Sequence, residues 1–274
     1  MIVGSIKEDL ALEKRVSLTP ETAKNIIGLG LKVCVEKEYA IHLGLKDEEY
    51  KKVGVEIKSS SSEVLSSSNL IIKVNCPSES EISILKENTI LIGMLNPSKN
   101  KIQIDKIINK KIKLFSLELL PRITRAQSMD VLSSQSNLAG YRAVIECVTE
   151  FEKAVPMMMT AAGTVPAAKV LVIGAGVAGL QAIATAKRLG AIVSATDVRA
   201  ASKEQVESLG GKFLTVEQTE DMETAGGYAK EASNEYKKKQ AEMMSDALKK
   251  KWYSHMYCFN TRETCSKNSN WAIS

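Results

Sequence analysis

The chain has 274 residues, of which 44% are hydrophobic and 25% are charged. This composition is typical of a globular protein with one large domain or two medium ones, and it excludes a disordered or fibrous chain. The formal net charge is +5, but residues 249–274 hold five basic residues and one acidic residue, so the rest of the chain is nearly neutral. We therefore expect no nucleic-acid-binding surface, because such a surface needs clustered positive charge.

The sequence also gives no indication of a membrane-spanning, secreted or metal-binding protein. The sequence has no apolar run long enough to cross a bilayer, so we expect no direct membrane span. It does not start with a basic region and an apolar core, so we expect no signal peptide. The five cysteines include no CxxC pair, which favours reduced cytosolic thiols, and we expect no bound metal.

Short apolar runs alternate with helix-compatible stretches through the first 120 residues. Thr19, Pro20 and Glu21 predict a helix start, with a capping hydroxyl, a proline in the first turn and an acid near the positive helix end. The Ser-rich stretches 59–62 and 66–68 favour helix caps and turns over linkers. This alternation predicts a parallel sheet covered on both faces. The expected strands are Ile2–Ile6, Leu31–Val35, Leu70–Val74, Thr89–Met94 and Ile112–Leu117.

Residues 133–153 predict one long helix that connects two lobes, because apolar residues such as Leu138 and Tyr141 recur at helical spacing. A linker of small residues follows. We expect its triplet Met157–Met159 to fill core space rather than bind a metal, because no other soft ligand lies near it in the sequence. A second α/β unit comes next. Its expected elements are strand Lys169–Ile173, helix Val177–Leu189, strand Ile192–Thr196, helix Ser202–Leu209, strand Lys212–Val216 and helix Ala229–Lys250.

The turn between the first strand and helix of this second unit matches the pattern G-x-G-x-x-G. Gly174 permits a tight turn, Gly176 lets the backbone approach a pyrophosphate, and Gly179 lets helix and strand pack closely. The helix N-terminus offers unpaired N–H groups to the phosphates. Because an apolar strand precedes this motif and a helix follows it, the sequence predicts a dinucleotide site rather than a turn without a ligand.

Asp197 ends the next strand, 18 residues after Gly179. A carboxylate at this point accepts hydrogen bonds from an adenosine ribose and repels a 2′-phosphate, which favours NAD(H) over NADP(H). Arg199 keeps the alternative open, because a nearby arginine can accommodate that phosphate.

Six motifs carry a family resemblance: Glu13–Pro20, Pro121–Asp130, Leu132–Gln135, Asn137–Tyr141, Met157–Pro166, and the fingerprint with Ala195–Arg199. On the basis of these motifs, the segment from Met1 to about Lys250 resembles the NAD(H)-binding domain I of proton-translocating NAD(P) transhydrogenase. Domain I is part of the alpha subunit of that enzyme. The resemblance implies an enzyme of the Re/Si-specific class, in which a hydride passes between NAD(H) on domain I and NADP(H) on a separate domain III. A membrane domain couples this transfer to proton translocation.

The resemblance further implies a homodimer that holds NAD(H) between its two lobes. The implied location is the cytoplasm, peripheral on the cytoplasmic face of the inner membrane through partner subunits. Hydride transfer between two nicotinamide rings requires that the rings be aligned, but it requires no general acid, nucleophile or metal. This agrees with the sequence, in which we identify no residues for such chemistry.

Site residues are also implied by the resemblance. The polar cluster around the nicotinamide, taken as the catalytic set, matches Arg122, Gln127, Asp130 and Ser133. From the residues alone, capping of the following helix by Ser128, Asp130 and Ser133 is an equal alternative. A mobile loop that carries Gly227 and Tyr228 would close over the nucleotide. The implied cofactor contacts are Gln127, Ser128, Met129, Asp130, Gly174, Gly176, Val177, Gly179, Asp197, Val198, Arg199, Gly227, Tyr228 and Gln240.

Alanine dehydrogenase is the nearest alternative, because it shares the architecture and the starting motif, and Arg15 and Lys73 match the positions with which it holds its substrate. That enzyme needs a histidine as acid/base, whereas the matching segment Leu95–Lys99 holds none. For Arg15 and Lys73 we therefore favour structural ion pairs, with cofactor-side contacts as the alternative, and we interpret His42 as a surface residue. A non-catalytic nucleotide-binding fragment is a further alternative.

The resemblance stops at about Lys250, where the family would continue with another strand. Residues 252–274 have no helical or alternating period, and no Gly or Pro follows Gly227. We expect an aberrant tail translated out of frame, with a genuine divergent tail as the alternative. A lobe that lacks strands predicts poor stability and impaired NAD binding. The expected organisation is an α/β fold of two Rossmann-like lobes, with lobe 1–132, connecting helix and linker 133–165, incomplete NAD-binding lobe 166–250 and tail 251–274.

Overall fold

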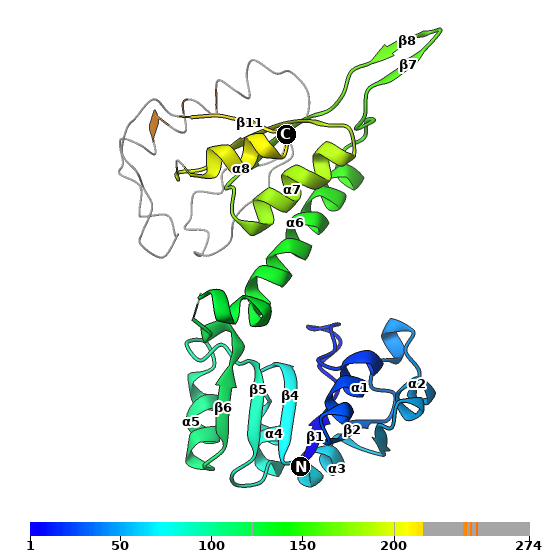
Figure 1. Ribbon diagram of the computed structural model, residues 1–274, viewed down its shortest axis with the longest axis vertical. Helices are drawn as coiled ribbons and strands as arrows, with labels where there is room; N and C mark the ends of the chain where they lie inside the picture. The colour runs from blue at the N-terminus through cyan, green and yellow to red at the C-terminus, as the bar shows by residue number, and fades with distance from the viewer. Residues whose placement is uncertain (122, 200, 216–237, 240–241, 243–244, 246–274) are drawn as a thin grey trace. The chain divides into compact units, whose positions relative to one another are not determined.

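The computed structural model describes residues 1–121, 123–199, 201–215, 238–239, 242 and 245 (Figure 1). The chain divides into two compact units, residues 1–131 and 132–274. Each unit builds its own parallel sheet around its own apolar core. No described helix is both long and apolar enough to cross a bilayer.

Six parallel strands form the sheet of the first unit, in the order β3-β2-β1-β4-β5-β6. Strand β1 lies inside the sheet, where Val3 pairs with Val33 on one side and with Leu70 on the other. The strand order reverses at β1, and this is the point of an open α/β sheet where ligands commonly bind. The strands are β1 Ile2–Ser5, β2 Lys32–Glu36, β3 Glu56–Lys58, β4 Leu70–Asn75, β5 Ile90–Met94 and β6 Lys113–Ser116.

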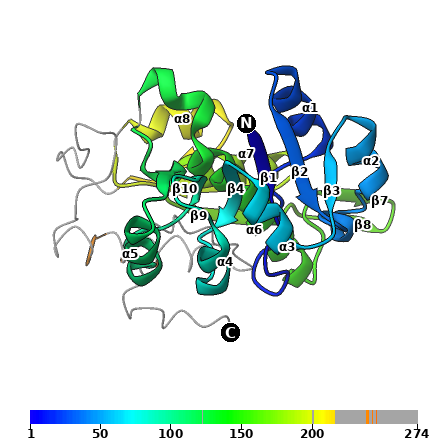
Figure 2. The same cartoon turned by 90° about the horizontal axis from the view of Figure 1, so that it is seen from below.

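The α-helices of the first unit lie on both faces of this sheet (Figure 2). Val33 and Val35 of β2 share a core with α1 and α2, whereas Cys34 between them shares the opposite core with α3, α4 and α5. This alternation follows from the two-residue period of a strand. The helices are α1 Pro20–Gly28, η1 Ile41–Leu43, α2 Asp47–Lys52, α3 Ser61–Ser67, α4 Glu79–Ile84, α5 Lys101–Asn109, η2 Leu117–Leu119 and η3 Thr124–Met129.

Local capping explains where several of these helices begin. The Thr19 hydroxyl accepts the N–H of Thr22 at 3.3 Å, and Pro20 opens α1, as its sequence predicts. Ser60 caps α3 and Ser78 caps α4 in the same way. The Ser-rich stretches therefore act as caps and turns, which confirms that prediction.

A buried hydroxyl network joins β1 and β4 to the segment that leads into α1. The Tyr39 hydroxyl lies 2.8 Å from Ser5 Oγ and accepts the backbone N–H of Ser17 at 3.0 Å. Ser5 Oγ and Ser17 Oγ lie 2.8 and 3.0 Å from the carbonyl oxygen of Ile72. Because buried polar groups are costly to leave unpaired, this network holds the segment before α1 in one conformation.

The second unit begins with a long helix and contains a parallel sheet in the order β11-β10-β9. Val144 of the long helix α6 packs with Val172, Ile183 and Val206 in the core of this unit. Two further strands, β7 and β8, form an antiparallel hairpin. The elements are α6 Val131–Glu150, β7 Met158–Thr160, β8 Gly163–Val165, β9 Lys169–Ile173, α7 Val177–Arg188, β10 Ile192–Thr196, α8 Ser202–Ser208 and β11 Lys212–Phe213.

The structure confirms the α/β fold with parallel sheets but differs from several expectations. Strands β3, β7 and β8 are not among the expected strands, and the strand expected over Lys212–Val216 ends at Phe213. The prediction that Met157–Met159 fill core space is wrong, because these side chains are 59%, 48% and 72% exposed. They lie on the β7–β8 hairpin, which projects from its unit (Figure 1), and they are not part of the core that the described residues form. The helix expected over Ala229–Lys250 lies largely outside the described residues.

Candidate functional site

The turn after β9 has the close backbone packing that its glycines predict. Gly174 has a φ of +90°, a conformation that favours glycine, and its N–H donates to the Thr196 carbonyl at 2.8 Å. A Cβ on Gly179 would lie 1.8 Å from the Gly174 carbonyl oxygen. Only glycine at position 179 therefore lets the first turn of α7 lie against the turn that precedes it.

Helix α7 begins at Val177, directly after this turn, and points its N-terminus toward the end of the strand. Gly176 is the N-cap residue and has no side chain with which to accept an N–H group of the first turn. Lys187 and Arg188 lie in the last turn, where basic residues complement the helix dipole. The N-terminus of α7 thus has the arrangement that binds phosphate groups.

Helix α6 packs closely against the first turn of α7 at another glycine, Gly140. A Cβ on Gly140 would lie 2.0 Å from the carbonyl oxygen of Ala178. The buried Gly140 therefore allows α6 to approach the first turn of α7. Sequence reasoning gave this residue no separate role, and its only signal was a small residue inside a long helix.

Asp197 follows β10 and turns its side chain back toward the glycine turn. The carboxylate is 6% exposed and accepts the N–H of Ala175 at 2.6 Å and that of Arg199 at 2.8 Å. Burial by itself raises the pKa of this carboxyl, but the hydrogen bonds from Arg199 and from the two backbone N–H groups outweigh it. The pKa of Asp197 therefore lies below its usual value, and the side chain is ionised at neutral pH.

The guanidinium of Arg199 lies on the same carboxylate. Its Nε donates to Asp197 Oδ1 at 3.0 Å and its Nη2 to Asp197 Oδ2 at 3.1 Å. Nη2 also lies 3.2 Å from the carbonyl oxygen of Ala175. Asp197 and Arg199 together thus hold both polar backbone groups of Ala175, inside the glycine-rich turn.

The segment expected at the nicotinamide lies in η3 and at the start of α6. Gln127, Ser128 and Met129 are exposed, whereas Asp130 and Ser133 are half-buried. The N–H of Asp130 donates to the Gln127 carbonyl at 3.2 Å. The structure thus brings Gln127, Ser128, Met129 and Asp130 together in the first unit. Ser133, Gly174, Gly176, Val177, Gly179, Asp197, Val198 and Arg199 belong to the second unit. Arg122, Gly227, Tyr228 and Gln240 lie outside the described residues.

Lys73, a residue of the alternative alanine-dehydrogenase site, is engaged within the fold. Its side chain is 4% exposed, and its Nζ lies 2.8 Å from Glu81 Oε1 and 3.8 Å from Glu8 Oε2. Burial raises the pKa of Glu8, while Lys73 and the N–H of Val74 act in the opposite direction. Two carboxylates from different segments thus surround one buried lysine, which fits the structural interpretation of Lys73.

The other residues weighed for the alanine-dehydrogenase alternative also have intramolecular contacts. Arg15 donates to Glu13 Oε2 at 2.7 Å. His42 is exposed, as expected, and its Nε2 lies 2.7 Å from the carbonyl oxygen of Lys14. Asn96, within the segment where a catalytic histidine would be expected, donates its N–H to Glu118. No group of three metal-binding side chains occurs among the residues that the structure describes.

Family models match both halves of the chain. Residues 4–139 match the N-terminal domain of the alanine dehydrogenase/PNT family, and residues 143–253 match its C-terminal domain. The end of the second match lies close to Lys250, where the motif resemblance stops.

Transhydrogenase subunits and alanine dehydrogenases are among the proteins with similar sequences. The first portion of the divided NAD(P) transhydrogenase alpha subunit of Rhodospirillum rubrum is 52% identical over 257 residues, covering 91% of this chain and 67% of the relative. The corresponding Rickettsia prowazekii protein is 49% identical, with 91% and 66% covered. Alanine dehydrogenase of Methanococcus maripaludis is 29% identical, with 78% and 58% covered.

A solved transhydrogenase from Sinorhizobium meliloti has a TM-score of 0.76 and 50% identity, covering 79% of this chain and 64% of that one. A solved L-alanine dehydrogenase has a TM-score of 0.69 at 22% identity, covering 79% and 61%, and supports the fold alone. The chain spans about two thirds of the length of these transhydrogenase relatives. On both the family match and the sequence identity, the chain belongs to the alanine dehydrogenase/PNT family and, within it, to the NAD(P) transhydrogenase alpha subunits.

Proposed function

We propose that the chain is the NAD(H)-binding subunit of a Re/Si-specific, proton-translocating NAD(P) transhydrogenase. In this reaction the hydride, with its two electrons, leaves NADH and joins NADP⁺, so that NAD⁺ and NADPH result. The observation that carries the proposal is the ionised, buried carboxylate of Asp197, which hydrogen-bonds to the glycine-rich turn at the N-terminus of α7. This combination suits a pyrophosphate next to an adenosine ribose.

The choice of NAD(H) over NADP(H) follows from the charge at Asp197. A 2′-phosphate beside an ionised carboxylate would be repelled, whereas the two hydroxyls of an unmodified ribose can donate to it. The guanidinium of Arg199 pairs with this carboxylate. We infer that the charge of Asp197, rather than that of Arg199, decides the choice of nucleotide.

Alignment of the nicotinamide is the chemical task of the remaining residues. We assign to Arg122, Gln127, Asp130 and Ser133 the positioning of the ring, with Ser128 and Met129 beside it. Direct hydride transfer requires contact between two rings and no proton transfer by the protein, so polar residues that orient the carboxamide suffice. Gly227, Tyr228 and Gln240 complete the proposed nucleotide contacts.

The partners follow from the same proposal. Two of the relatives are named as the first portion of an alpha subunit, so each of them is a component of a larger enzyme. We propose that this chain acts with an NADP(H)-binding domain III and a membrane domain. It would then stand at the cytoplasmic face of the inner membrane without spanning it. We further propose a homodimer. The exposed methionines of the β7–β8 hairpin form an apolar surface, and a second copy of the chain would bury this surface away from water.

The assignment also covers the organisation of the chain. We propose that residues 1–132 and 166–250 are the two lobes of domain I, joined by the helix and linker 133–165. The aberrant tail proposed for residues 251–274 lies outside the described residues. Genomic DNA would test it: an uninterrupted reading frame in independent reads, with no family-like strand encoded in a neighbouring frame, would contradict the proposal.

Nucleotide titration and hydride exchange test the function. We expect fluorescence titration to give tighter binding of NADH than of NADPH, and addition of a purified domain III to give hydride exchange between the two nucleotides. Alanine-dependent reduction of NAD⁺ would instead favour the alanine-dehydrogenase alternative. Absence of binding to either nucleotide would favour the non-catalytic fragment.

A further inference from the structure

Every hydrogen-bonding position of the Asp197 carboxylate is taken by a donor of the protein itself. Oδ1 accepts the backbone N–H of Arg199 at 2.8 Å and its Nε–H at 3.0 Å. Oδ2 accepts the N–H of Ala175 at 2.6 Å and the Nη2–H of Arg199 at 3.1 Å. A carboxylate has about four acceptor positions, two on each oxygen, so this set is full.

Two of these four donors are fixed by the fold. The N–H of Ala175 belongs to the glycine-rich turn, and the N–H of Arg199 belongs to the backbone two residues after Asp197. The other two belong to one guanidinium at the end of a long side chain. That side chain is 19% exposed, so it borders solvent, and a change of its rotamer would withdraw the guanidinium while the backbone donors stay in place.

A ribose that donates its hydroxyls to Asp197 needs the positions that the guanidinium holds. We propose that the Arg199 side chain occupies the ribose-binding positions of Asp197 before the nucleotide arrives, and that the nucleotide binds by displacing it. The proposal rests on the proposed function, because it concerns the same site. It makes Arg199 a competitor of the ribose hydroxyls rather than a receptor for a 2′-phosphate.

The contact has a physical role before a nucleotide binds. A buried carboxylate without a partner is costly, and the guanidinium compensates this charge until the ribose hydroxyls replace it. Nη2 also lies 3.2 Å from the Ala175 carbonyl, so the same guanidinium holds the glycine-rich turn in position. Displacement by the ribose therefore trades one set of hydrogen bonds to Asp197 for another, and the ribose gains less than it would at an open carboxylate.

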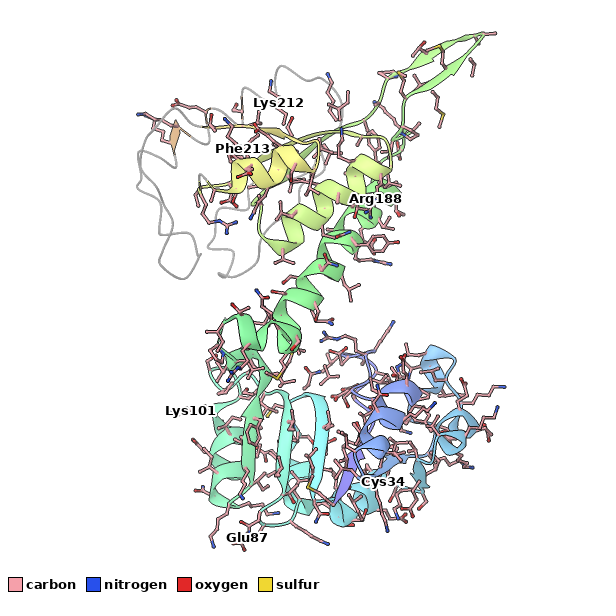
Figure 3. The ribbon with its side chains drawn as sticks, viewed as in Figure 1. Cys34, Glu87, Lys101, Arg188, Lys212 and Phe213 are labelled. Carbon is pink, nitrogen blue, oxygen red and sulfur yellow. The ribbon has the colours of Figure 1, made fainter. Side chains whose placement is uncertain are left out.

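The test compares ADP with 2′-deoxy-ADP, which lacks one of the competing hydroxyls. Dissociation constants are measured by equilibrium dialysis for the unmodified chain, Arg199→Met and Arg199→Lys. Arg188→Met is the matched control, because Arg188 is an exposed arginine in the last turn of α7, in the same unit (Figure 3). The quantity compared is the ratio of the two constants, which cancels any general weakening of the site in a variant.

We expect the unmodified chain and Arg188→Met to prefer ADP by about twofold or less. In Arg199→Met the preference should rise at least fivefold, because no guanidinium has to leave. Arg199→Lys should lie between them, since an ammonium cannot pair with both oxygens in the same fork geometry. Asp197→Asn in combination with Arg199→Met should remove the increase.

The outcomes separate this inference from the function on which it rests. An unchanged ratio in Arg199→Met, with NADH still bound, would overturn the displacement and leave the NAD(H) site in place. Binding of ADP by Arg199→Met but not by the unmodified chain would support the displacement most strongly. Absence of ADP and NADH binding in every variant would overturn both.

Discussion

At the scale of single residues, Asp197 shows how a charge persists where burial alone would remove it. Its carboxylate is 6% exposed, and burial is the largest influence on its pKa, in the upward direction. Hydrogen bonds from Arg199 and Ala175 together outweigh that influence. The same contacts that keep the side chain ionised also connect β10 to the glycine-rich turn, so charge and backbone position depend on each other.

Asp197→Asn tests this coupling through the pH dependence of stability. The folded-state pKa lies below the unfolded value of about 4, so the stabilisation is complete above pH ~4 and is lost as the pH falls through the folded pKa. We expect the variant to lose about 2 kcal/mol of unfolding free energy at pH 7 and progressively less below pH ~4. Urea unfolding followed by circular dichroism at several pH values measures the difference. A loss that does not change with pH would contradict the ionised state.

Gly179→Ala tests the close contact between α7 and the turn before it. The added Cβ would lie 1.8 Å from a backbone oxygen, so turn and helix must separate, at a cost of about 2–3 kcal/mol and with weaker NADH binding. Gly28→Ala is the control, because nothing lies within 4 Å of its Cβ position. Thermal unfolding with and without NADH compares the two variants. Equal stability of both would mean that the close approach is not required.

At the scale of elements, buried charge joins segments that are far apart in the sequence. Lys73 on β4 lies between Glu81 of α4 and Glu8, in the loop after β1. Glu8 also accepts the N–H of Val74 at 2.7 Å, which fixes that loop to the end of β4. Lys73 thus holds three segments of the first unit together: β4, α4 and the loop after β1.

Lys73→Ala should destabilise the first unit by about 3–5 kcal/mol, because it leaves two carboxylates near each other without their cation. The loss should be larger at pH 8 than at pH 5, since protonation at the lower pH removes some of the repulsion. Lys111→Ala is the control: its ion pair with Glu87 is exposed on both sides and contributes at most about 1 kcal/mol. Denaturant unfolding at both pH values provides the comparison. Equal effects of the two substitutions would contradict the structural role of Lys73.

At the scale of the whole molecule, the β7–β8 hairpin exposes apolar side chains to solvent. Met157, Met159 and Val165 are about half exposed or more, and each strand has three residues. A two-stranded hairpin is marginally stable in water, so an apolar one needs a surface to cover it. The proposed homodimer supplies that surface as a second copy of the chain.

Met158→Glu should shift the chain from dimer to monomer, because it places a charge in the proposed interface opposite Val165. We expect at least a tenfold weaker dimer in sedimentation equilibrium. Leu12→Glu is the control, since Leu12 is 84% exposed but lies in the first unit. Dissociation by Leu12→Glu but not by Met158→Glu would place the interface elsewhere.

Sequence by itself determined most of the strands and helices and the nucleotide fingerprint. Strands β9 and β10 have the predicted bounds, and Thr19 caps α1, because strand periodicity, capping and turn geometry depend on neighbours within a few residues. The same is true of Gly174 and Gly179, whose roles follow from their spacing alone.

Tertiary structure alone decided which charges are paired and which apolar residues are exposed. It put Lys73 between Glu8 and Glu81, set Gly140 against Ala178, and left the methionines of the hairpin uncovered. It also laid the guanidinium of Arg199 on Asp197, where sequence left open a phosphate-binding role. The physical reason is that desolvation and side-chain pairing depend on groups that the chain brings together only when it folds.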